Sequence, residues 1–172
     1  HLHLKLCCDT SASARCYGER LSGFSGSSGE RIANDIGAVP RVVAIAPSDI
    51  GFASSSCATW REVVGPSTSS TTAPFAEGVY LVNVDVAPGL WRSVTPSVPF
   101  ICYWERLNAF GGISAHRITN DIGKGPRVVS IAQGDVGFST SGCGTWNLVT
   151  GPITTSPTAD FGEGVFMVGS DI

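Results

Sequence analysis

Residues 75–86 read FAEGVYLVNVDV, and the same pattern returns as FGEGVFMVGSDI at residues 161–172. The two stretches lie 86 positions apart, which is half of the 172-residue chain. Other blocks recur at the same offset, for example CYGERL at 16–21 and CYWERL at 102–107. More than half of the pairs from residue 16 onward are identical, and no gap is needed. The chain is therefore a tandem duplication, and this repeat governs the prediction of the fold.

The repeat unit consists of short segments that are typical of β-strands. Residues 78–86, 89–94 and 127–132 are rich in β-branched and aromatic side chains, and Gly, Pro, Asn or Asp bound them. No window of the sequence carries a capped apolar stripe with helical period. We therefore predict an all-β protein made of two tandem small β-sandwich or barrel modules related by the 86-residue repeat.

The repeat and the predicted modules are out of phase. Two segments rich in Ser, Thr and Pro are typical of linkers. The chain then divides into a first module, a linker, a complete second module, a second linker and a free donor-type strand: 1–64, 65–74, 75–150, 151–160 and 161–172. The complete module begins at residue 75, so residues 1–64 form a module whose opening strand is missing or replaced. Residues 1–15 also share little with residues 87–101.

The strand predicted to open the second module is apolar on both faces. Tyr80, Val82 and Val84 share one face, while Val79 and Leu81 share the other. Such a strand favours insertion between two layers over an exposed edge. The segment at the C-terminal end has the same character, and its candidate intersubunit residues are Phe161, Val165, Phe166, Met167, Val168 and Ile172.

The cysteines also follow the repeat. Cys16 and Cys57 are 41 positions apart, and so are Cys102 and Cys143. One disulfide in each module is the simplest interpretation. Four buried free thiols are an alternative, whereas the absence of a Cys-x-x-Cys spacing disfavours zinc.

The adjacent pair Cys7 and Cys8 has no counterpart in the second copy. Neighbouring residues of a strand point to opposite faces, so these two cysteines are poorly placed to bond to each other. They either bond to another segment or another chain, where they would lock an intersubunit joint, or stay unpaired.

Composition excludes several classes of function. The net charge is −3, the pI is near 5.5 and only 15% of residues are charged, so no basic stripe is available for nucleic acid. No apolar run approaches the roughly 20 residues that a membrane-spanning helix needs. A low charge content together with many Ser, Thr and Gly residues favours an extracellular or cell-surface protein.

Catalytic motifs are not found in the sequence. It contains no phosphate-binding Gly-rich loop, no Gly-x-Ser-x-Gly elbow and no His-Glu-x-x-His. The three histidines, His1, His3 and His116, are not duplicated. We therefore predict that the chain is not an enzyme and has no cofactor.

Two metal sites were weighed against simpler interpretations. A free amine at His1, together with His1 or His3, would suit Cu²⁺ or Ni²⁺, but an exposed N-terminal strand is the simpler interpretation. Asn34 and Asp35 with a neighbouring loop offer oxygens to Ca²⁺. Asx turns and pairing with arginine account for the same acidic residues more simply, so no metal site is predicted.

Several blocks of the second copy resemble a known repeat. They are DVAPGLWRS at 85–93, CYWERL at 102–107 and GCGTW at 142–146. Together they resemble a repeat found, often in tandem, in secreted and cell-surface bacterial proteins, for which no activity is established. The resemblance covers one full unit and the first unit from Cys16 onward, while residues 1–15 depart from it. It implies export and a cysteine-bridged β module, and it implies no catalytic residues.

The phase mismatch leads to the main functional hypothesis. Residues 161–172 of one copy would donate a strand to residues 16–64 of another, giving a structural extracellular protein that assembles head to tail into a filament or surface array. Two alternatives are open. Residues 161–172 could complete the first module of the same chain, or the chain could be two repeats of a longer repeat array. A different kind of function is the alternative hypothesis: a pair of modules that binds carbohydrate or cell wall through Trp91, Tyr103 and Trp104.

Overall fold

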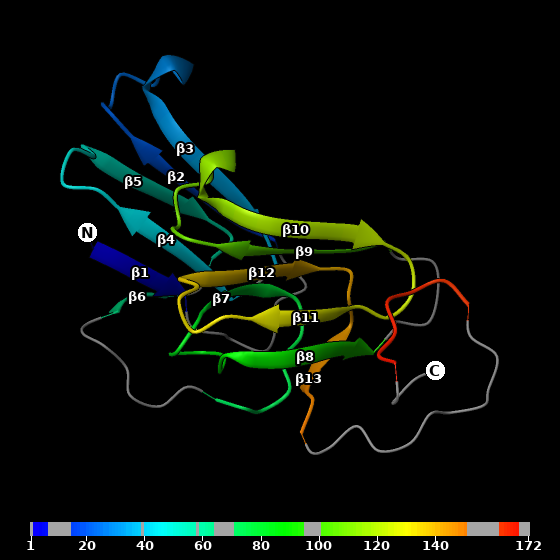
Figure 1. Ribbon diagram of the computed structural model, residues 1–172. Helices are drawn as coiled ribbons and strands as arrows, with labels where there is room; N and C mark the ends of the chain where they lie inside the picture. The colour runs from blue at the N-terminus through cyan, green and yellow to red at the C-terminus, as the bar shows by residue number, and fades with distance from the viewer. Residues whose placement is uncertain are drawn as a thin grey trace.

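The computed structural model describes residues 2–6, 15–38, 40–57, 59–63, 71–94, 101–150 and 162–168. It is an all-β structure of four sheets, two in each half of the chain, with single 3₁₀ turns at Ser28–Glu30 (η1) and Ser114–His116 (η2). Figure 1 shows the strands of the first half of the chain, β1–β6, next to those of the second half, β7–β13. The predicted fold class is confirmed.

The second module contains two antiparallel sheets. One has the order β10-β9-β12-β7, and the other has the order β11-β8-β13. The seven strands, in chain order, are β7 (Gly78–Leu81), β8 (Gly89–Val94), β9 (Cys102–Leu107), β10 (Arg117–Gly123), β11 (Val128–Ile131), β12 (Gly137–Ser141) and β13 (Thr145–Leu148). Their inward side chains form one core, as expected for a sandwich of two sheets.

The first module repeats this plan with one strand fewer. Its sheets have the orders β3-β2-β5 and β4-β1-β6. The strands are β1 (Leu2–Leu6), β2 (Cys16–Leu21), β3 (Arg31–Gly37), β4 (Arg41–Ile45), β5 (Gly51–Ser55) and β6 (Trp60–Val63). In the second module β7 pairs with the outer edge of β12. Among the described residues, no strand pairs with the corresponding edge of β5.

The N-terminal strand β1 takes the place of β8, but in a shifted register. Leu4 lies opposite Val43, at the position where Trp91 lies opposite Val129. A gapless 86-residue offset would have put Lys5 there instead. The alignment of the first fifteen residues is therefore wrong by one position in this strand. Strand β1 therefore pairs with β4 one residue out of phase with the repeat.

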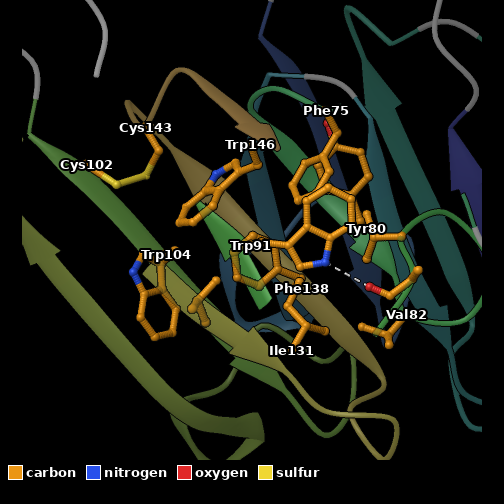
Figure 2. Close-up of a cluster of buried hydrophobic side chains, with 13 residues drawn as sticks. Phe75, Tyr80, Val82, Trp91, Cys102, Trp104, Ile131, Phe138, Cys143 and Trp146 are labelled. Atoms are coloured by element: carbon orange, nitrogen blue, oxygen red, sulfur yellow. Dashed lines mark hydrogen bonds between the residues drawn. A yellow bond between two sulfur atoms is a disulfide. The ribbon is translucent and has the colours of Figure 1, made fainter. Parts of the chain in front are cut away.

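The core of the second module is a cluster of aromatic rings around Phe75 (Figure 2). The Phe75 ring centroid lies 4.8 Å from those of Tyr80 and Trp91 and 5.9 Å from that of Phe138. Trp91 donates its indole N–H to the carbonyl oxygen of Ala87 over 2.9 Å, so its buried polar atom has a partner. This cluster fixes both sheets of the module against each other.

Both predicted disulfides are present. Cys16 is bonded to Cys57 and Cys102 to Cys143, each closing the same 41-residue separation. Each bond ties the start of the strand β2 or β9 to the turn that follows β5 or β12. Such cross-links restrict the unfolded chain, and this matters for small modules with limited cores.

Candidate functional site

The joint between the two modules is formed by β7, whose two faces belong to different cores. Tyr80 lies in the aromatic core of the second module. Val79 and Leu81 point the other way and pack with Val42 and Ala44 of β4 in the first module. All four residues of β7 are buried. The expectation that this strand is inserted between layers rather than exposed is confirmed.

A backbone contact anchors β7 to the first module. The Val79 amide donates to the carbonyl oxygen of Pro40 over 2.8 Å. The preceding residue, Gly78, has φ of +148°, and a Cβ there would lie 2.6 Å from Cδ of Pro40. Only glycine permits this close approach. The sequence showed the recurrence of Pro40, but no role was predicted for it.

The same anchor is repeated at the far end of the chain. The Val165 amide donates to the carbonyl oxygen of Pro126 over 2.8 Å. Gly164 has φ of +156°, and its Cβ position lies 2.8 Å from Cδ of Pro126. Residues 162–168, drawn in red in Figure 1, therefore begin on the second module as β7 begins on the first. The predicted donor strand is not formed here, because no strand is assigned within 162–168.

One face of the first module lacks the cover that its twin receives. Phe110, which follows β9, is 6% exposed because it packs with Val42 and Ala44 of the first module. Its counterpart, Phe24, is 74% exposed. Ile50 is also exposed, whereas its counterpart Val136 packs in the joint. The two modules therefore differ in how far this pair of apolar positions is buried.

The edge of β5 is likewise unfilled within the described residues. Strand β12 pairs with β9 on one side and β7 on the other, whereas β5 pairs only with β2 among the described strands. Phe138 and Trp146 are fully buried, but their counterparts Phe52 and Trp60 are only partly buried. As far as the described strands show, the core of the first module has an open side where β7 closes the second.

A cleft of about 250 Å³ runs along the joint between the modules. Its walls include the ion pair of Arg41 with Asp35 and that of Arg117 with Glu105. His116 also lines the cleft, and its buried Nδ1 has no hydrogen-bond partner among the described residues. The paired charges make this cleft a nearly neutral polar seam beside the apolar joint.

The predicted carbohydrate platform is not on the surface. Trp91 is 0% exposed and Trp104 is 8% exposed, and both rings pack in the aromatic core (Figure 2). The third member, Tyr103, is half-buried and donates its hydroxyl to Glu105 over 2.8 Å. The prediction of a stacking surface is wrong for the two tryptophans, because the core of this module uses them as filling.

Three of the recurring acidic pairs, Glu19/Glu105, Asp35/Asp121 and Asp49/Asp135, are engaged by arginine. Asp35 accepts hydrogen bonds from Arg41, so the calcium alternative would compete with a formed ion pair. Among the described residues, no three His, Cys, Asp or Glu side chains gather as a metal site would require. The ion pairs that were offered as the simpler interpretation are present.

One largely buried pair joins β2 to the turn between β4 and β5. Arg20 donates to Asp49 from Nε and Nη2 over 2.6 and 2.8 Å, and the Ala46 amide donates over 2.8 Å. The hydrogen bonds from Arg20, and then that from Ala46, hold the pKa of Asp49 below its usual value. The arrangement recurs between Arg106 and Asp135 in the second module.

We expect Asp49→Asn to lower the free energy of unfolding at pH 7 by about 2 kcal/mol, since hydrogen bonds to charged groups are worth about 1.5–3 kcal/mol. The folded pKa of Asp49 is lowered, so this contribution is complete above the unfolded pKa of about 3.9. It disappears as the pH falls through the folded pKa. Urea unfolding of both proteins from pH 7 to pH 2 measures this, and a difference that persists unchanged at pH 2 contradicts it.

Several predicted residues lie outside the described part of the chain. They are Cys7, Cys8, Phe161 and Ile172, together with both predicted linkers except residues 71–74. Within the described residues, no helix is long and apolar enough to span a membrane. Pro40 and Phe110 were missed as joint residues, although the recurrence of each at the 86-residue offset was a usable signal.

The comparisons with known proteins identify a domain family. The Rv1352-like extracellular domain matches residues 8–61 and again residues 71–147, consistent with a tandem repeat of that domain. No similar protein was found among the curated proteins or among the solved structures. The family is extracellular, and the two disulfides agree with an oxidising compartment, so the chain is an extracellular protein.

Proposed function

The chain belongs to the Rv1352-like extracellular domain family, and we propose that it is a structural protein that joins copies of itself head to tail. The back of one copy docks on the front of the next by the contact that already joins the two modules within one chain. The proposal assigns no reaction to the chain. The recurring carboxylates Glu19, Asp49, Glu105 and Asp135 serve as partners of arginine.

A single observation supports the proposal. The front of the first module resembles one side of the joint between the modules, and the back of the second module resembles the other side. The front half consists of Phe24, Ile50 and the β5 edge, all without the cover that their counterparts receive. At the back, Val128 and Ser130 of β11 are less buried than their counterparts Val42 and Ala44. The tail begins on Pro126 in the same way as β7 begins on Pro40.

This contact is heterologous, because different surfaces of the two copies meet. Heterologous contacts propagate into filaments unless they close into a ring. Donation of an edge strand supplies backbone hydrogen bonds and buries alternate side chains on both faces. Two modules in one chain would then act as two links of a longer array.

Sedimentation velocity over a hundredfold range of concentration tests the proposal. We expect the mass to rise with concentration, and we expect removal of residues 161–172 to hold the chain at the monomer mass. The thermal midpoint should change little on removal, because within the described part of the tail Gly162, Glu163 and Val168 are exposed and residues 164–167 are partly exposed. A chain that stays monomeric at every concentration overturns the proposal, and so does a truncated chain that assembles as well as the intact one.

A further inference from the structure

The internal joint also specifies the register of the donated strand. Resting on the proposed head-to-tail assembly, we propose that residues 164–167 of one copy pair antiparallel with β5 of a second copy, with Val165 opposite Ala53 and Phe166 opposite Phe52. This alignment makes the tail the fourth strand of the β3-β2-β5 sheet. It is one of several alignments that a four-residue strand permits, so it is a separate claim from assembly itself.

The register is taken from the second module. There β7 pairs antiparallel with β12, Val79 lying opposite Ser139 and Tyr80 opposite Phe138. The 86-residue offset converts the first pair into Val165 with Ala53 and the second into Phe166 with Phe52. A shift of one residue would exchange the two faces of the tail and put Phe166 outside the core.

Phe166 then fills the open side of the first module's core. Tyr80, its counterpart, is buried with its ring 4.8 Å from that of Phe75. In the acceptor, Phe52 and Trp60 meet edge to face at 5.2 Å and are only partly buried. A third ring beside Phe52 extends this cluster in the manner of the second module. Aromatic pairs of this kind add about 0.5–1.5 kcal/mol beyond the area that they bury.

The proposed register also places Glu163 where it can accept a hydrogen bond from the acceptor. In the second module, Oε1 of Glu77 accepts from the amide of Gly142 over 2.6 Å. The offset replaces these residues by Glu163 of the donor and Ser56 of the acceptor. Ser56 has φ of +54°, close to the +68° of Gly142, although serine rarely adopts positive φ. The acceptor turn therefore already has the backbone conformation that presents this amide to a carboxylate.

The direction of the backbone groups decides which residue pair is closest. The Val79 amide donates to Pro40, away from β12, so Val79 and Ser139 form a pair without mutual hydrogen bonds. Opposed residues of that type have Cα atoms about 4.5 Å apart. The Val165 amide points to Pro126 in the same way. Val165 and Ala53 of two copies are thus the pair best placed for an engineered disulfide.

The test uses the full chain carrying Ala53→Cys and Val165→Cys, oxidised with diamide while assembled and analysed by mass spectrometry of linked peptides. The control carries Ser55→Cys and Val165→Cys. Ser55 is two residues along β5, where diagonal neighbours lie about 7–8 Å apart, so we expect about tenfold less linkage between copies. Ser55 is exposed, and Ala53 and Val165 are partly exposed. Sedimentation velocity reports whether each variant assembles.

Linkage of residue 53 to residue 165 between copies, well above the control, supports the register. Assembled variants with equal or greater linkage in the control overturn the register and leave head-to-tail assembly standing. Variants and parent chain that never assemble overturn both. Substitution Glu163→Gln gives a second measurement. Within one copy this carboxylate lies 3.9 Å from Nζ of the exposed Lys124, so Lys124→Gln is the matched control. Assembly that is weakened by Glu163→Gln but not by Lys124→Gln, at an unchanged thermal midpoint, supports contact with the acceptor, whereas equal effects contradict it.

Discussion

Replacing Phe24 by aspartate should abolish assembly while leaving the isolated chain folded. Phe24 is 74% exposed, so its loss costs the free chain little. In an assembled joint it would occupy the position of Phe110, packed against residues equivalent to Val42 and Ala44. Burying an unpaired carboxylate there is prohibitive. We expect the apparent dissociation constant to rise by at least about a hundredfold, which corresponds to about 2.7 kcal/mol.

The matched control is Ile122→Asp. Ile122 is 63% exposed on β10, and its counterpart Ile36 remains exposed although a second module follows it. This surface therefore lies outside the joint, and we expect assembly to be unchanged. Sedimentation velocity measures both variants, with circular dichroism as the check on folding. Equal effects of the two substitutions would mean that general surface charge, rather than the joint, controls association.

The sequence predicted the features that follow directly from periodicity. Duplicated spacing predicted Cys16–Cys57 and Cys102–Cys143, and both bonds are present. The absence of a polar face on residues 79–82 predicted an inserted strand, because alternation of side chains is a property of any strand. The structure adds that the layers on its two sides belong to different modules.

The position of the tryptophans was not predictable in the same way. Trp91 and Trp104 have no counterparts in the first copy, so the repeat gave no constraint, and exposure and burial were both compatible with the pattern. Their burial depends on three-dimensional packing around Phe75, which one sequence does not encode as a period. The shifted register of β1 was hidden for a related reason, since residues 1–15 retain too little of the repeat to align.

The difference between Phe24 and Phe110 is visible only when the two modules are compared in the structure. Phe24 and Phe110 are identical residues at equivalent positions, and only the presence of a preceding module distinguishes their surroundings. A sequence pattern assigns both to the same environment. The difference in exposure therefore depends on the neighbouring module, and under the proposed assembly Phe24 lies on the face where the next copy is expected.

Replacing Trp146 by alanine should lower the stability of its module more than replacing its counterpart Trp60 lowers that of the first module. Assembly should make the two losses of stability more alike. Trp146 is 0% exposed, packs 5.4 Å from Phe138 and donates its indole N–H to Thr140. We expect Trp146→Ala to cost about 4 kcal/mol, the usual range for a buried aromatic residue. Trp60 is only partly buried beside Phe52, so Trp60→Ala should cost about half as much in the dilute chain.

Native-state hydrogen exchange, read separately on the β9–β12 and β2–β5 amides, measures the two costs, because each module reports its own opening free energy. Under assembling conditions the donated tail would cover Trp60, so the cost of Trp60→Ala should rise towards that of Trp146→Ala. The second module already contains β7 and Phe75, so its cost should not change. A cost for Trp60→Ala that is the same in dilute and assembled samples would mean that the open side of the first core is not where the next copy binds.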